Sequence, residues 1–165
     1  MSEKIPIFII NLKQDLHKRK HMEKLCSQHN LNCQFIEAIY GTDLDEETLA
    51  KVYNKKESID LIGRELSKGE LGCALSHISV YKHMVDQNIK QAIIFEDDIQ
   101  IEEDFSSIIQ NINTLPDNWE LILLGYFKGS VEKEKLVKSY LRDRKKITDT
   151  HKLVRLKRTA SGSHG

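Results

Sequence analysis

Short, nearly continuous apolar runs alternate along this sequence with longer stretches that carry helical spacing. We predict strands at 5–12, 33–39, 91–96 and 119–125, and helices after Asp15 and at 45–53, 67–87 and Phe105–Ile112. Apolar runs without a polar alternation are typical of parallel strands that are buried on both faces. The order of strands and helices therefore predicts an α/β fold, with a mainly parallel sheet and helices on both faces.

The formal net charge is zero, but it is divided unevenly along the 165 residues. Residues 126–165 hold 12 Lys and Arg against 4 Asp and Glu, and the rest of the chain is correspondingly acidic. The basic end can meet an anionic acceptor or a membrane surface, or it can simply be solvated. It lacks the interleaved aromatics of a nucleic-acid binder, so we predict no nucleic-acid partner. Within it, Lys152–Leu156 is predicted as a further strand.

The sequence has no feature that indicates a membrane span or a secretion signal. No apolar run approaches the length of a membrane span, and the first residues do not have the features of a signal peptide. We therefore expect a single cytoplasmic domain over residues 1–165. The three cysteines, Cys26, Cys33 and Cys73, form no CxxC pair and are expected to be reduced, partly buried thiols.

A run of acids ends the apolar segment that starts at Ala92. Glu96, Asp97 and Asp98 follow directly, and six carboxylates fall within the nine residues 96–104. Acids packed at the end of a buried strand repel one another unless a positive charge lies among them. A hard divalent cation such as Mg²⁺ or Mn²⁺, which prefers oxygen ligands, would supply that charge. The simpler alternative is that these acids only end the strand and cap the next helix.

The stretch 67–85 is the most regular predicted helix. Ser67 followed by Glu70 forms a capping box, and small residues such as Gly72 allow another backbone or a ligand to come close. Ser76 and His77 then place polar groups in a helix that otherwise faces the core. A histidine in this position is as readily a structural residue as a catalytic one.

The start of the chain suggests a second site. A strand followed by a helix places backbone N–H groups at the carboxyl edge of a sheet, where phosphate tends to bind, and Lys18 and Arg19 are within reach. The glycine fingerprint of dinucleotide binding is absent. His17 and His21 are four residues apart, but their surroundings favour a solvated helix face over a zinc site.

Four segments together resemble glycosyltransferase family 25, the bacterial lipopolysaccharide and lipooligosaccharide enzymes related to procollagen galactosyltransferase domains. They are FIINL with the later Arg19, FIEAIYG at 35–41, LSKGELGCALSHISVYK at 66–82, and IIFEDDI at 93–99 followed by WELILLG. Their order and spacing agree with the family over essentially the whole chain. The resemblance implies a GT-A-like, Rossmann-like nucleotide-sugar fold in which Glu96-Asp97-Asp98 stand where that fold carries its DxD-type motif.

The resemblance also implies a function and a set of site residues. We expect an inverting, metal-dependent transfer of galactose or glucose from a UDP-sugar to an oligosaccharide or lipid-linked core acceptor, as in lipopolysaccharide biosynthesis. The expected cofactor is Mn²⁺ or Mg²⁺, and the expected ligands are Glu96, Asp98 and His164. Asp97 is a candidate catalytic carboxylate, and the general base is otherwise unassigned. The residues expected on the donor side are Asn11, Arg19, Glu70, Ser76 and His77.

Family members usually continue beyond a GxHGY-like segment, whereas this sequence stops part-way through it, at 161–165. We therefore expect a domain that lacks the usual C-terminal part. The alternative function is a catalytically impaired remnant that still binds a nucleotide sugar or a divalent cation. A glycoside hydrolase is disfavoured, because its two carboxylates must flank a bond and cannot be sequence neighbours. Peripheral contact of the basic end with the cytoplasmic face of the inner membrane is also expected.

Overall fold

A computed structural model describes residues 5–112, 119–124, 141–148 and 152–156. The chain divides into two compact units, Met1–Ile101 and Glu102–Gly165, which are described separately. The prediction of a single domain stays a prediction. In the described residues, no helix is both long enough and apolar enough to cross a bilayer.

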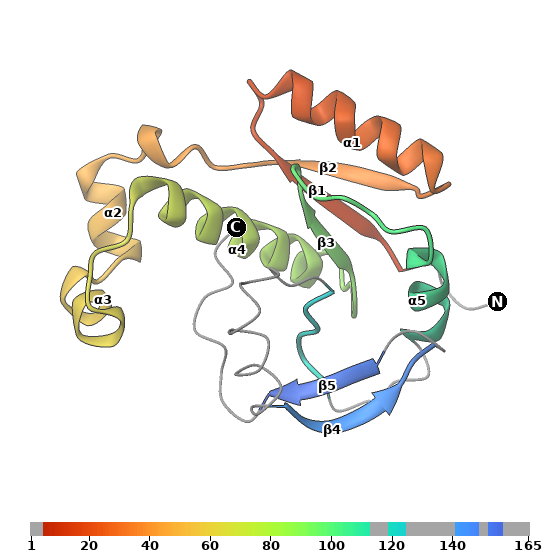
Figure 1. The fold of residues 1–165 in the computed structure, drawn as a ribbon. Helices are drawn as coiled ribbons and strands as arrows, with labels where there is room; N and C mark the ends of the chain where they lie inside the picture. The colour runs from red at the N-terminus through yellow and green to blue at the C-terminus, as the bar shows by residue number, and fades with distance from the viewer. Residues whose placement is uncertain (1–4, 113–118, 125–140, 149–151, 157–165) are drawn as a thin grey trace. The chain divides into compact units, whose positions relative to one another are not determined.

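The first unit is built on a parallel sheet of three strands, in the order β2-β1-β3 (Figure 1). The strands are β1 (Ile7–Asn11), β2 (Cys33–Glu37) and β3 (Ile93–Glu96). β1 is central and every one of its residues is buried. The chain leaves β1 for β2 on one side and returns to β3 on the other side. The carboxyl ends of β1 and β3 are therefore the topological switch point of the sheet, which is where open α/β sheets tend to bind ligands.

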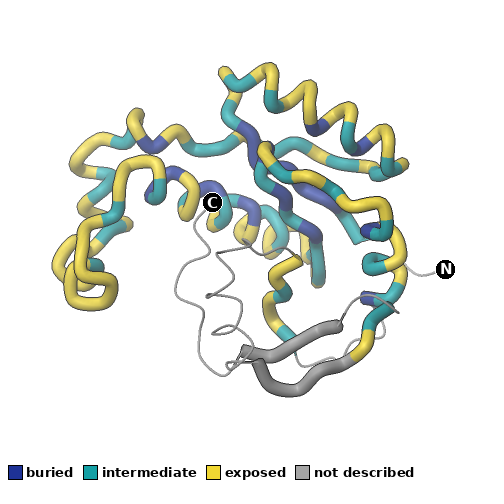
Figure 2. The backbone as a smooth tube through the Cα atoms, in the orientation of Figure 1, coloured by how far each residue is buried: buried dark blue, intermediate teal, exposed yellow. Residues whose placement is uncertain are grey.

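Helices cover both faces of this sheet, as predicted (Figure 1). On one face, Phe8 and Ile10 of β1 form a buried cluster with Val80 of α4 (Lys68–Asp86). Successive strand residues point to opposite faces, so Ile7 and Ile9 face the other side, where α1 (Leu16–Gln28) lies. Figure 2 shows the resulting dark-blue core along β1.

The beginning of α4 packs directly on the backbone that follows β2. A Cβ atom on Gly72 would lie 2.6 Å from the Ile39 carbonyl oxygen and 2.7 Å from the Gly41 nitrogen. The buried Ser76 hydroxyl accepts a hydrogen bond from the Ile39 N–H at 2.8 Å and donates one to the Gly72 carbonyl at 2.6 Å. The close approach anticipated at the glycines is therefore an approach of backbone to backbone. It fixes the rotation of α4 about its own axis.

The polar stretch between β2 and α4 contains a 3₁₀ turn, η1 (Gly41–Asp43), and two short helices, α2 (Glu46–Val52) and α3 (Lys55–Ile62). α2 agrees with the helix predicted at 45–53, but α3 is not among the predicted helices. Asn54 caps its start by accepting a hydrogen bond from the Glu57 N–H, and Gly63 ends it with φ of 79°. These are ordinary helix start and stop signals.

The second unit contains α5 (Phe105–Ile112) and an antiparallel pair, β4 (Leu141–Lys146) and β5 (Lys152–Leu156). α5 and β5 match the predicted segments. β4 was missed because its LRDRKK sequence has no apolar pattern. The predicted strand at 119–125 is wrong over 119–124, where the structure has no strand and Leu121 is 72% exposed. An apolar run becomes a strand only if another strand pairs with it, and no described residue pairs with this one.

Cys26 and Cys33 form a disulfide, with their Cα atoms 6.5 Å apart. The expectation of three reduced thiols is therefore wrong for this pair. The reason is local, since a short turn returns the end of α1 to the start of β2 and brings the two side chains together. Cys73 on α4 is a free and exposed thiol.

Candidate functional site

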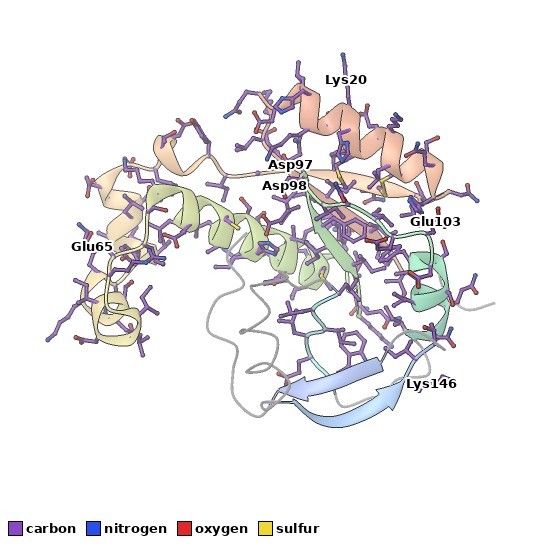
Figure 3. All side chains as sticks on the ribbon, viewed as in Figure 1. Lys20, Glu65, Asp97, Asp98, Glu103 and Lys146 are labelled. Atoms are coloured by element: carbon purple, nitrogen blue, oxygen red, sulfur yellow. A yellow bond between two sulfur atoms is a disulfide. The ribbon has the colours of Figure 1, made fainter. Side chains whose placement is uncertain are left out.

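The acidic residues after β3 lie at the carboxyl edge of the sheet, where Figure 3 labels Asp97 and Asp98. Glu96 is paired in register with Ile10, whose side chain faces α4. Because strand side chains alternate, Glu96 also faces α4, and Asp97 faces α1. The two neighbouring acids therefore have separate sets of contacts.

On the α1 side, both carboxylate oxygens of Asp97 are bound by the protein. The Asn11 side-chain amide donates a hydrogen bond to Oδ2 at 2.7 Å, and the Lys18 ammonium donates one to Oδ1 at 2.9 Å. Asn11 and Asp97 are buried, and the hydrogen bond to Asp97 is the main cause of a raised pKa at Lys18. We call Asn11, Lys18 and Asp97 the Asp97 cluster. It ties β1 and α1 to the end of β3.

On the α4 side, Cys73 and His77 point at one oxygen of Glu96. His77 Nε2 lies 3.4 Å from Glu96 Oε1, and Cys73 Sγ lies 3.8 Å from the same oxygen. The hydrogen bond with His77 lowers the pKa of Glu96. Partial burial of the thiol, helped by the charge of Glu96, raises the pKa of Cys73. We call these three residues the Glu96 cluster. Among the described residues, they are the group of three potential metal ligands that the fold brings together.

Asp98 belongs to neither cluster. Its side chain is 66% exposed, and its Oδ2 lies 3.7 Å from the Lys18 ammonium. It is therefore a solvent-facing carboxylate at the same sheet edge as Glu96, with oxygens that a hard cation can reach. The prediction that Glu96 and Asp98 share a metal ion stays a prediction. His164, the third predicted ligand, lies outside the described residues.

Arg19, predicted to lie on the donor side, has its guanidinium 4.1 Å from the centre of the Phe35 ring. Its Nε also donates to a Glu23 carboxylate oxygen at 3.1 Å. These contacts hold the side chain against β2 and its own helix. A role in donor binding stays a prediction.

Glu70 and Ser76, also predicted on the donor side, have contacts that set the position of α4. Glu70 completes the predicted capping box with Ser67 and receives two hydrogen bonds from the Arg64 guanidinium, at 2.6 and 2.9 Å. Arg64 holds the pKa of Glu70 well below its usual range. His77 is different, because its side chain faces the acidic edge.

Two residues of this edge received too little weight from the sequence. The sequence predicts Lys18 only as a residue within reach of a phosphate, and Cys73 only as a reduced, partly buried thiol, whereas Cys73 is exposed in the structure. A signal for Cys73 was present, since residues 73 and 77 are one helical turn apart and the next strand ends in Glu96. No local signal paired Lys18 with Asp97, which lies 79 residues away.

Comparison with known proteins places this fold in a family. Residues 4–165 match the family model described as glycosyltransferase family 25 (LPS biosynthesis protein). The chain is 31% identical over 144 residues to procollagen galactosyltransferase 2 of Homo sapiens, covering 79% of the chain and 22% of that protein. It is 28% identical over 146 residues to procollagen galactosyltransferase 1-A of Xenopus laevis, covering 79% of the chain and 24% of that protein.

A third relative is inactive glycosyltransferase 25 family member 3 of Homo sapiens, with 27% identity over 143 residues, covering 79% of the chain and 23% of that protein. The chain thus spans about a quarter of the length of these curated relatives. The family model, by contrast, matches nearly all of the chain. The chain belongs to glycosyltransferase family 25.

Proposed function

We propose that this chain is a glycosyltransferase that moves a hexose from a UDP-sugar to a hydroxyl group of an oligosaccharide or lipid-linked core acceptor. The observation that carries the proposal is the acidic carboxyl edge at the β1–β3 switch point, in a chain of this family. Galactose is the favoured sugar because two of the relatives are named galactosyltransferases, and glucose is the alternative. The family description favours a lipopolysaccharide acceptor over procollagen.

The chemistry requires charge compensation on the leaving group. When the sugar departs, the diphosphate of UDP gains negative charge, which a bound divalent cation would stabilise. Glu96 and Asp98 would hold that ion. They fit Mn²⁺ or Mg²⁺ because they offer carboxylate oxygens on the partly exposed edge of the sheet.

The other residues of the edge would prepare this site. Asp97 is buried, with both oxygens engaged, so its contacts favour a positioning role over proton transfer. Its candidacy as a catalytic carboxylate stays a prediction. Lys18 places one positive charge beside Asp98, where it would lower the repulsion between the carboxylates and a phosphate. The general base that takes the acceptor proton is not among the residues assigned.

Calorimetric titration with UDP, with and without Mn²⁺, tests the proposal. We expect Mn²⁺-dependent binding that weakens on the order of 10-fold or more in Asp98→Asn, because a proposed ligand of the metal ion is lost. Asp60→Asn is the matched control. It removes the same charge from an exposed position on α3 and should bind UDP like the wild type. Absence of UDP binding in both conditions would rule out the proposed function.

A second candidate is a remnant that binds the nucleotide sugar without transferring it. The match to a relative named inactive supports it. The two candidates separate on one measurement, the release of UDP from UDP-galactose with water or an oligosaccharide acceptor present. Binding without any release identifies the remnant, and release that stops in Asp98→Asn identifies the transferase. For the transferase, we also propose a cytoplasmic location in which the basic segment 126–165 contacts the inner membrane.

A further inference from the structure

We propose that the Glu96 cluster (Cys73, His77 and Glu96) is a binding site for a borderline-soft divalent cation such as Zn²⁺. It differs from the hard-ion site suggested for Glu96 and Asp98, because two of its three donors are sulfur and nitrogen. The inference concerns metal binding alone and does not depend on sugar transfer.

The helix places the first two ligands. Cys73 and His77 are four residues apart on α4, so they lie one above the other on the same helical face. The rotation of that face is fixed, because Ser76 is held by the Ile39 N–H and the Gly72 carbonyl. The third ligand comes from the end of β3, and strand alternation turns its side chain to the α4 face.

The two distances from Glu96 Oε1 are close to those of a tetrahedral site. Zinc bonds of about 2.3 Å to sulfur and about 2.0 Å to nitrogen or oxygen place neighbouring ligand atoms roughly 3.3–3.5 Å apart. Glu96 Oε1 lies 3.4 Å from His77 Nε2 and 3.8 Å from Cys73 Sγ. All three ligand atoms lie within 4.8 Å of one another. A zinc ion would therefore bind after side-chain rotations that draw the Cys73 sulfur closer to the other two ligand atoms.

The donor set selects the metal. Thiolate and imidazole favour Zn²⁺ over Mg²⁺ or Ca²⁺, which prefer ligands made entirely of oxygen. Three protein ligands leave the fourth tetrahedral position open, as in exchangeable or catalytic zinc sites and unlike closed structural ones. Exposure of Cys73 gives the ion a route in from solvent. A bound Zn²⁺ would also occupy Glu96, which is a proposed ligand of the Mn²⁺ or Mg²⁺ that binds with the UDP-sugar. This last consequence rests on the proposed function.

Cobalt is the sharpest probe, because a thiolate bound to Co²⁺ gives a charge-transfer absorption band in the near ultraviolet that oxygen and nitrogen ligands do not give. The protein is prepared without reductant, so that the Cys26–Cys33 disulfide stays closed and a thiol assay shows Cys73 as the free thiol. We expect the band on adding Co²⁺ and its displacement by Zn²⁺. A cobalt spectrum without the band overturns the proposal.

Variants then locate the site. Zn²⁺ affinity, measured by calorimetry, should fall on the order of 100-fold in Cys73→Ser and in His77→Gln, because each removes a direct ligand. Asp98→Asn keeps all three ligands and should bind Zn²⁺ within a few-fold of the wild type. The double variant His17→Gln/His21→Gln removes a helical histidine pair of the same spacing and should also be unaffected. The proposal fails if Cys73→Ser binds like the wild type, or if Asp98→Asn or the histidine control loses as much affinity as Cys73→Ser.

Discussion

Glu96 and Asp97 are adjacent in the sequence, yet they meet different surroundings on the two sides of the sheet edge. Asp97 is 8% exposed and is bound by an amide and an ammonium group from β1 and α1. Glu96 is about half exposed and faces a thiol and an imidazole from α4. The difference shows that a run of acids is not one site. Strand alternation turns the Asp97 carboxylate toward groups that hold the fold together, and it turns the neighbouring Glu96 carboxylate to the partly exposed α4 side, where a ligand can reach it.

The largest expected effect is the loss of the buried member of this pair. Asp97→Ala should lower the free energy of unfolding by about 2–3 kcal/mol, because it removes the nearer acceptor of the buried Asn11 amide and the nearer counter-ion of Lys18. Urea unfolding followed by circular dichroism measures it.

Asp98→Ala is the matched control for that prediction. It removes the same group one residue later, where the side chain is 66% exposed, and should change stability by no more than about 0.5 kcal/mol. If the two variants lost equal stability, the distinction between a structural and a solvent-facing acid would be wrong.

A smaller effect is expected from the contact that orients the α4 side. A methyl group on Gly72 would press against the Ile39 carbonyl and the Gly41 nitrogen, which are backbone atoms that cannot move alone. Gly72→Ala should therefore cost about 1–2 kcal/mol and shift α4, which carries Cys73 and His77. Urea unfolding gives the stability, and the cobalt absorption described above reports the shift as a weaker band.

Gly69→Ala provides the comparison within the same helix. The atom nearest to its added Cβ is the Ser67 hydroxyl oxygen at 3.9 Å, which is an ordinary contact. Alanine is the better helix former, so stability should be unchanged or rise by up to about 1 kcal/mol. A similar stability change in both variants would mean that the packing of α4 on the backbone after β2 is not what requires glycine at position 72.

The sequence predicted the parts of this architecture that depend on local pattern. The three parallel strands, the capping box at Ser67 and Glu70, and α5 follow from apolar spacing and cap residues, which act within a few positions. It also located the acidic edge. It failed at 119–124, because an apolar run does not specify a pairing partner, and at β4, whose charged sequence has no strand pattern.

The division of the acidic run could not be predicted in the same way. Asn11 and Lys18 reach Asp97 from 86 and 79 positions away, and a single sequence contains no signal for such pairs. The disulfide between Cys26 and Cys33 could not be predicted for a related reason. The turn from α1 to β2 brings the two cysteines together, and no cysteine motif in the sequence indicates the pair. Tertiary placement decides these features, whereas pattern decides the elements that carry them.

The smallest expected effect is a pH dependence confined to the α1 side. The pKa of Lys18 in the folded protein is raised, chiefly by its hydrogen bond to Asp97. The stability that Lys18 contributes is therefore fully present below its unfolded pKa of about 10.4, and it is lost as the pH rises through its folded pKa. Lys18→Met should therefore be less stable than wild type at neutral pH, by less than about 1 kcal/mol because the lysine is one-third exposed. The difference in unfolding free energy between Lys18→Met and the wild type should disappear as the solution becomes strongly alkaline.

Lys20→Met is the control, because Lys20 lies on the exposed side of the same helix. Its difference in unfolding free energy from the wild type should not change in this way with pH. Urea unfolding across this pH range measures both, and a constant difference for Lys18→Met would show that the ion pair does not stabilise the Asp97 cluster.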